Sequence, residues 1–160
     1  MQPATFDESL DAILRKDPRF HREAYHFVSE ALNHTQKLFN KATKAQSRPK
    51  AGGDLPVEKV RHVTGQQLLD GVRLFALELF GPMTITVLEE WGVRRCEDFG
   101  EIVFNMVESS LLHKTEEDTR EAFQGGYDFT EAFRRPFQPS RQLVAPSPEA
   151  TAPKPDSHTT

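Results

Sequence analysis

The triplet Asp98-Phe99-Gly100 is the stretch of this sequence whose residue types most directly suggest chemistry. In protein kinases the same three residues form a magnesium-holding motif beside the phosphates of ATP. A kinase also needs a glycine-rich loop, a strand lysine and a catalytic-loop Asp with its Asn, and this sequence has none of them. Asp98 and Glu101 instead have the spacing of a capping box, in which Asp98 accepts from the first turn and Glu101 reaches back. We therefore interpret Asp98 as the N-cap of a helix.

A second pattern concerns metal binding. Glu23 and His26 form a Glu-x-x-His pair, the unit that di-iron helical bundles use, and Glu30 and His34 continue the same stripe. A di-iron site needs a second such pair, and the sequence contains no other Glu-x-x-His. The stripe also lies mostly away from the apolar face of its predicted helix. We therefore predict no metal or other cofactor, and we keep these four residues as the metal candidates of a less favoured enzyme hypothesis.

Cys96 is the only cysteine, so the chain cannot form an intramolecular disulfide or a cysteine metal cluster. Its position just before a predicted helix can lower the pKa of a thiol, but the neighbouring Glu97 and Asp98 oppose the thiolate. We interpret Cys96 as structural. The sequence also lacks a Gly-x-Ser-x-Gly elbow, a P-loop and a dinucleotide fingerprint, so we predict no catalytic residues.

The basic residues gather in one region, 37–61, which has seven Lys or Arg residues against two acids. Residues 42–57 within it read as a flexible linker, because they include two glycines and two prolines and no aromatic residue. Without aromatic residues, contact with RNA or another polyanion would use phosphates rather than stacked bases. The residues that we expect to make such contacts are Lys41, Lys44, Arg48 and Lys50.

The acidic residues gather in region 84–131, which has twelve acids against four Lys or Arg residues. On the predicted helix that follows Asp98, the positions outside the apolar face are polar or acidic. We interpret this face as a surface for a protein partner. Its members are Glu97, Glu101, Asn105 and Glu108.

The elements that position these residues are predicted to be helices. Apolar residues spaced by threes and fours predict helices at 6–15, 18–41, 64–80, 82–91 and 98–111. Asp17 followed by Pro18 predicts the start of the second helix, and the Thr64 and Gln67 capping box predicts the start of the third. The core positions predicted on the second and fourth helices are Phe20, Ala24, Phe27, Val28, Ala31, Thr35 and Leu38, and Met83, Val87, Leu88 and Trp91.

Beyond residue 112 the helical pattern weakens. Thr115 can cap a short helix through Phe123, and Asp128 can cap a last turn through Phe133. Alternatively, residues 111–115 and 127–129 pair as a small C-terminal hairpin, which would give a winged-helix-like variant. The second helix of such a variant carries acidic residues, which phosphates would repel. These acids argue against sequence recognition of DNA by that helix.

The expected organisation is mainly α: one compact multi-helix domain over residues 1–137, followed by a disordered Pro-rich tail over 138–160. The first residues have acids where a signal peptide needs bases, and no long apolar run suggests a membrane helix. We therefore expect a soluble cytoplasmic protein.

The block HVTGQQLLDGVRLFALELFGPMTITVLEEWGVRRCEDFGEIVFNMVESSLL covers residues 62–112, with HREAYHFVSEAL upstream and GGYDFTEAF downstream. Together these segments resemble an uncharacterised bacterial family restricted mainly to Planctomycetes and Verrucomicrobia. The resemblance spans residues 6–137 and rests on VTG, FGPM, WGV, DFGEIVFN and GYDF in this order, with looser local fits at Thr84 and Ser110. That family has no assigned activity, so the resemblance implies a single domain and no chemistry.

These observations favour a non-catalytic interaction or accessory module that binds a protein partner. The alternative is an accessory protein that contacts phosphate or RNA through region 37–61. A carboxylate–histidine metal enzyme is the third hypothesis. The oligomeric state and the identity of a partner do not follow from the sequence.

Overall fold

The computed structural model describes residues 2–46 and 62–139 of the chain. In these residues the elements are five α-helices and four short turns of helix, and there is no strand. The α-helices are α1 (Phe6–Lys16), α2 (Arg22–Gln46), α3 (Gly65–Phe80), α4 (Thr84–Glu90) and α5 (Cys96–Glu108). The short turns are η1 (Gly81–Met83), η2 (Arg120–Phe123), η3 (Thr130–Arg134) and η4 (Arg135–Phe137). The predicted mainly α fold is confirmed, and neither the hairpin nor a wing forms in the described residues.

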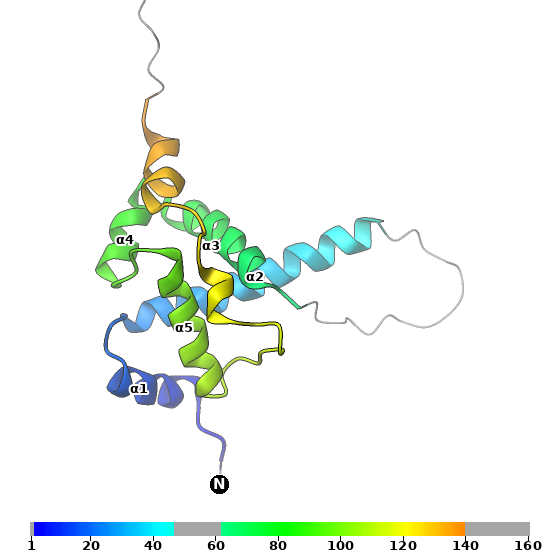
Figure 1. The fold of residues 1–160 in the computed structure, drawn as a ribbon, viewed down its shortest axis with the longest axis vertical. Coiled ribbons are helices and arrows are strands. Elements are labelled where there is room, and N and C mark those ends of the chain that lie inside the picture. The colour runs from blue at the N-terminus through cyan, green and yellow to red at the C-terminus, as the bar shows by residue number, and fades with distance from the viewer. Residues whose placement is uncertain (1, 47–61, 140–160) are drawn as a thin grey trace, which may run out of the picture.

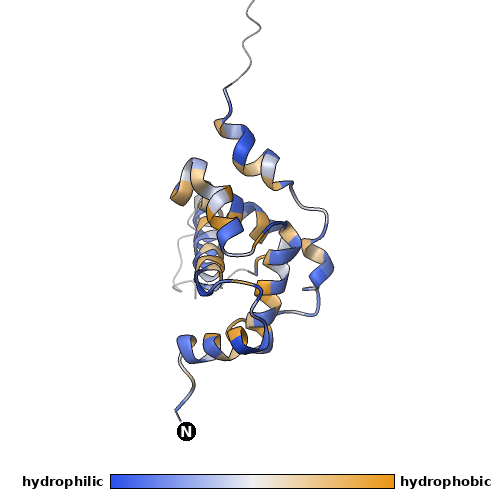
Figure 2. Ribbon diagram, turned by 90° about the vertical axis from the view of Figure 1, so that its left-hand side faces the viewer, coloured by the Kyte–Doolittle hydropathy of each residue, from blue (hydrophilic) through white to orange (hydrophobic). Residues whose placement is uncertain are grey.

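The helices pack around one core (Figure 1). α2 and α3 make the most extensive contact, α5 packs against both, and α1 covers the start of α2 and α5. The close approach of α2 and α3 depends on Gly71, where a Cβ would lie 1.9 Å from Thr35 Oγ1. Figure 2 shows that hydrophobic and hydrophilic residues alternate around the helices, as one buried face per helix requires.

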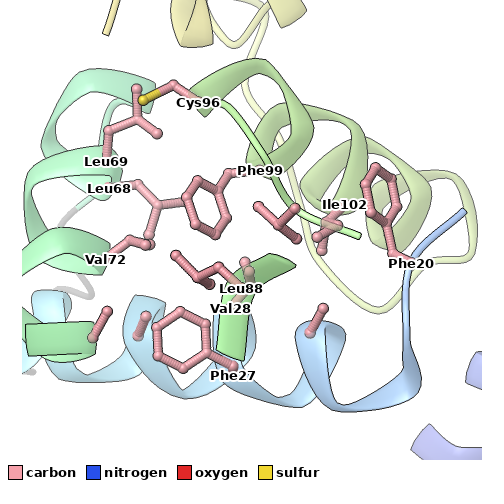
Figure 3. Close-up of a cluster of buried hydrophobic side chains, with 14 of the residues drawn as sticks. Phe20, Phe27, Val28, Leu68, Leu69, Val72, Leu88, Cys96, Phe99 and Ile102 are labelled. Atoms are coloured by element: carbon pink, nitrogen blue, oxygen red, sulfur yellow. The ribbon is translucent and has the colours of Figure 1, made fainter. Parts of the chain in front are cut away.

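The core is apolar and aromatic (Figure 3). Leu68, Leu69 and Val72 of α3 meet Phe99 and Ile102 of α5. The buried face of α2 packs against both groups and completes the core. The buried residues of that α2 face are Ala24, Tyr25, Phe27, Val28, Ala31 and Thr35. Five of these six were expected from the spacing, and Tyr25 was not. Leu38 was expected in the core and is instead 45% exposed, because the end of α2 reaches beyond the other elements (Figure 1).

The junction of α1 and α2 differs from the prediction. Thr5 caps α1 through a capping box with Glu8, and Asp17 is the C-cap of α1 rather than the N-cap of α2. An Asp17 carboxylate oxygen accepts from the backbone N–H of Arg19, two residues further along the chain, at 3.2 Å. This hydrogen bond stabilises the turn between α1 and α2. α2 therefore begins four residues later than expected, at Arg22.

α3 begins as predicted. Thr64 Oγ1 accepts from the Gln67 N–H at 3.2 Å, and Gln67 Oε1 accepts from the Thr64 N–H at 3.1 Å. Gly81 ends the helix with a positive φ of 50°, a conformation that favours glycine. Pro82 then lies in η1 and not at the start of α4.

The predicted core face of α4 is partly wrong. Thr84, Ile85 and Leu88 are buried, whereas Met83 is 57% exposed. Val87 and Trp91 are half-buried. Met83 lies in η1 and not in α4, so the apolar spacing counted from Met83 does not describe the buried face of α4.

α5 begins at Cys96, two residues before the predicted cap. Asp98 is therefore inside the first turn, where one carboxylate oxygen accepts from the N–H groups of Arg94 (2.9 Å) and Arg95 (3.3 Å). The Asp98 carboxylate thus stabilises the start of α5. It does so by accepting from N–H groups that precede the helix, which is the role that we had assigned to Glu101. Phe99 is buried, so the triplet is part of the packed helix.

Residues 109–139 wrap around the helices without a regular sixth helix. A short helical turn remains at Arg120–Phe123, while Asp118 accepts from the Thr115 N–H at 2.8 Å and closes a turn before it. As predicted, Asp128 caps the last turn, with its carboxylate accepting from the Glu131 N–H at 3.1 Å. Most of the predicted tail, from residue 140 on, lies outside the described residues.

One helical run in the described residues, Gly65–Glu90, is long and apolar enough to cross a membrane by length and composition. A core helix of a soluble protein meets the same requirements. Leu68, Leu69 and Val72 of this run are buried in the core. Leu74, Leu79 and Met83 are more than half exposed, and Leu79 had been expected on the apolar face of α3. The expectation of a soluble protein stays a prediction.

Candidate functional site

A polar hollow of about 410 Å³ lies where α1, the turn after it, α5 and η2 meet. Its lining is dominated by charged and amide side chains. The lining residues are Ala12, Ile13, Lys16, Asp17, Arg19, Glu101, Asn105, Glu108, Ser109 and Arg120. We call this site the polar hollow.

The positions of the α5 residues follow from helix geometry. Glu101, Asn105 and Glu108 are spaced by four and three residues, which places them on one side of α5. Ile102 and Met106 take the opposite side into the core, and both are fully buried. The same amphipathic pattern therefore builds the core and presents the polar side chains to the hollow.

Asp17 is the most constrained carboxylate in the hollow. It accepts from Arg19 Nε at 2.8 Å and from Arg19 Nη2 at 2.7 Å, and Asn105 Nδ2 donates to it at 2.9 Å. The hydrogen bonds from the Arg19 side chain hold the pKa of Asp17 well below its usual range. Partial burial opposes this effect, and the bond from Asn105 adds to it. Asp17 is therefore a stable anion that fixes the turn.

Asn105 also joins the hollow to the core. Its Nδ2 donates to the hydroxyl of Tyr25 at 3.1 Å, and the Tyr25 side chain is fully buried. Burial raises the pKa of the Tyr25 hydroxyl, and the bond from Asn105 works in the opposite direction. Tyr25 therefore serves as a neutral buried anchor for Asn105.

The remaining charges alternate in sign across the hollow. Arg19 Nη2 and Arg120 Nη1 both approach the same oxygen of Glu101, each at 3.3 Å. Arg120 Nη2 also bonds to Glu108 at 3.3 Å, and Lys16 Nζ lies 3.7 Å from the second oxygen of Glu108. Each exposed pair of this kind contributes about 0–1 kcal/mol to stability, so the network serves orientation more than stability.

The structure brings together three of the four residues expected to form the interaction surface. Glu101, Asn105 and Glu108 line the hollow, whereas Glu97 does not. The expected acidic surface is also neutralised there, since Lys16, Arg19 and Arg120 face the carboxylates of Asp17, Glu101 and Glu108. No local sequence signal marked Arg19 or Arg120 as partners, because both reach Glu101 through the tertiary fold.

The residues expected to contact RNA are not all on a loop. α2 continues to Gln46, so Lys41 and Lys44 lie on a helix rather than on a flexible loop. The physical reason is composition, because residues 42–46 are mostly strong helix formers without glycine or proline. The other two residues, Arg48 and Lys50, lie outside the described residues.

The metal candidates are dispersed along α2. Glu23 and Glu30 are exposed, His26 lies 3.6 Å from Asp7, and His34 packs on the ring of Phe75 at 5.0 Å between centroids. Within residues 2–46 and 62–139, no three His, Cys, Asp or Glu side chains form a group that could hold a metal ion.

Cys96 is buried under the segment that follows η2. Its Sγ donates to the backbone carbonyl of Tyr127 at 3.3 Å. Burial raises the pKa of the thiol to about 11, against the opposing effect of that hydrogen bond. Glu97 raises the pKa further, as its charge led us to expect. The thiolate needed by a nucleophile is therefore disfavoured here.

Comparison with known proteins assigns no relative to this chain: no family model, no curated protein and no solved structure matches it. The resemblance noted from the sequence therefore stays a prediction, and the function has to be argued from the site.

Proposed function

We propose that this protein is a non-catalytic interaction module, and that a segment of a partner protein docks in the polar hollow. The observation that carries this proposal is the hollow itself, a recess of about 410 Å³ lined mainly by charged and amide side chains. Its side chains are already oriented by hydrogen bonds to one another and, through Asn105, to buried Tyr25. Preorganised polar groups reduce the ordering cost of binding.

The charge pattern favours a partner segment that carries both signs. Cations and carboxylates alternate in the hollow, so a ligand of one sign would be attracted by half of them and repelled by the others. Neighbouring acidic and basic side chains on one segment would match this alternation. Such complementarity mainly selects the partner and its register rather than adding affinity.

The test is a comparison of two charge-swap variants in a pull-down from the native host, read by mass spectrometry. The hollow variant, Arg120→Glu with Glu108→Arg, keeps a pair between these two positions. It also places like charges beside Glu101 and Lys16, and so reverses the pattern that a partner meets. The control variant, Glu131→Arg with Arg135→Glu, swaps an exposed pair that does not line the hollow. Circular dichroism verifies that both variants are folded.

We expect a partner that binds the wild type and the control variant but not the hollow variant. The same order of affinities should appear when the purified partner is titrated in a calorimeter. A partner that binds both variants equally would exclude the hollow as the docking site. The cytoplasmic location expected from the sequence stays a prediction.

A second candidate function is contact with RNA or another polyanion through the end of α2. Lys37 and Lys41 are exposed one helical turn apart, and neither pairs with a carboxylate of the described residues. Lys44, three residues further on, extends the spacing that keeps positions on one helix face. Lys37 and Lys41 can therefore reach phosphates without any change in the core, and Lys44 is the third candidate by its position along α2.

This candidate predicts a strong salt dependence. With three phosphate contacts, affinity for a single-stranded homopolymer RNA should fall roughly twentyfold between 50 and 200 mM salt. Binding is measured by the fluorescence anisotropy of a labelled RNA. Changing Lys37, Lys41 and Lys44 to Glu should abolish the rise in anisotropy that the wild type causes. Changing the exposed Arg15, Arg94 and Arg134 to Glu alters the net charge equally and should preserve most of the binding. Equal loss in both triple variants would point to net charge alone.

A further inference from the structure

A second, smaller cavity of about 80 Å³ lies between α2, the start of α3, α5 and the segment that leads to η2. In Figure 1 that segment leaves the end of α5, loops outward and returns to η2, which packs beside α5. The floor of the cavity is apolar, with Leu32, Leu68, Val103, Val107 and Phe123 among its lining residues. Leu68 and Phe123 of this floor are buried, whereas the polar end of the cavity faces solvent. The exposed polar residues of the lining include His62, His113, Lys114 and Thr119.

The polar end contains a fixed pair. Asp118 Oδ1 lies 2.9 Å from His62 Nε2, and Asp118 Oδ2 accepts from the N–H of Thr115 at 2.8 Å and from its hydroxyl at 3.3 Å. Both carboxylate oxygens of Asp118 are therefore engaged within the protein. The pair holds the segment against the start of α3 and leaves the carboxylate with little capacity for a ligand.

Lys114 is the remaining charged residue of the lining, and its charge is available. Its Nζ lies 5.7 Å from the ring centroid of Phe104, which also lines the cavity. No carboxylate of the described residues pairs with Lys114. The cation–π contact keeps the ammonium near the cavity without neutralising its charge.

We propose that this cavity binds a short aliphatic carboxylate, with the alkyl chain on the apolar floor and the carboxylate against Lys114. We infer a negatively charged ligand because the one unpaired charge of the lining, that of Lys114, is positive. The length follows from the volume: an apolar cavity of about 150 Å³ holds a benzene molecule, so half of that volume holds a chain of about three to four carbons. This site is separate from the polar hollow and does not rest on the proposed function.

The chain-length dependence tests the floor. In a ¹⁵N-edited NMR titration of the full chain with acetate, propionate and butyrate, shifts should saturate and map to Leu68, Val103 and Val107. Each methylene that enters the floor should strengthen binding about fourfold. Octanoate, which is too long for the cavity, should bind no better than butyrate. Butylamine has a comparable chain and the opposite charge, and it should cause no saturable shift.

Two variants test the residues. Lys114→Gln removes the charge at an exposed position and should weaken butyrate binding at least fivefold. Val107→Phe fills the cavity from the half-buried face of α5 and should abolish the shifts. Lys41→Gln removes an equivalent charge at a residue that does not line the cavity, and it should change nothing.

Absence of saturable shifts with every acid, or equal binding of butylamine, would overturn the proposal. Unchanged butyrate binding by Lys114→Gln would also overturn it, and that exposed variant remains informative even if Val107→Phe fails to fold.

Discussion

The side-chain amide of Asn105 donates to Asp17 at 2.9 Å although the two residues are 88 positions apart. The same amide nitrogen donates to buried Tyr25 at 3.1 Å. One side chain of α5 therefore joins the turn after α1 to the core of α2. The orientation of the side chains that line the polar hollow depends on these two hydrogen bonds, so Asn105 is the first target for mutation.

Asn105→Ala should lower the free energy of unfolding by about 1–3 kcal/mol, because it leaves the buried Tyr25 hydroxyl without its partner. Urea unfolding measures the change. In the double variant with Tyr25→Phe the loss should be smaller than the sum of the two single losses, because the two residues are in contact. Glu97→Gln, on the same helix but outside the hollow, should stay within about 0.5 kcal/mol of the wild type. Strict additivity would show that the hydrogen bond contributes nothing.

Asp17 should make stability sensitive to acid. Its pKa in the folded protein lies below the unfolded value of about 3.9, mainly because of the Arg19 hydrogen bonds. The stabilisation is therefore fully present above the unfolded pKa, and it is lost as the pH falls through the folded pKa. Asp17→Asn should be less stable than the wild type at pH 7, and the difference should shrink below about pH 4. Urea unfolding at pH 7, 4 and 3 measures it, and a constant difference would contradict the prediction.

Asp98 should behave as a helix-start residue and not as a metal ligand. Asp98→Ala should cost about 0.5–2 kcal/mol, since the N–H groups of Arg94 and Arg95 lose their acceptor. Asp98→Asn keeps an acceptor oxygen and should cost less. Thermal unfolding with and without magnesium completes the test. A magnesium-dependent rise in melting temperature for the wild type alone would replace the capping interpretation with a metal site.

Cys96 should be unreactive in the folded protein. Its side chain is 2% exposed and its thiol pKa is raised to about 11 by burial, so little thiolate is present at pH 8. A chromogenic disulfide reagent should label almost none of the native protein within minutes. In denaturant it should label one thiol per chain. Fast labelling of the native protein would mean that the segment covering Cys96 opens readily.

The start of α3 and the buried face of α5 followed from the sequence, because the interactions behind them are local. The Thr64 and Gln67 hydrogen bonds that begin α3 span three residues, and their residue types predicted them. The α5 face with Phe99 and Ile102 is likewise a matter of 3.6-residue periodicity. Even where the boundary of α5 was misplaced by two residues, Asp98 still accepted backbone hydrogen bonds at the helix start.

The tertiary structure alone decided the character of the site. Glu101 was visible in the sequence as an exposed acid, but its partners Arg19 and Arg120 are 82 and 19 positions away. Which cations face a carboxylate depends on the path of the chain between helices, and side-chain spacing along one helix contains no information about that path. The same reason applies to His62 and Asp118, 56 positions apart, which meet beside a cavity only because residues 111–123 fold back over α5 and the start of α3.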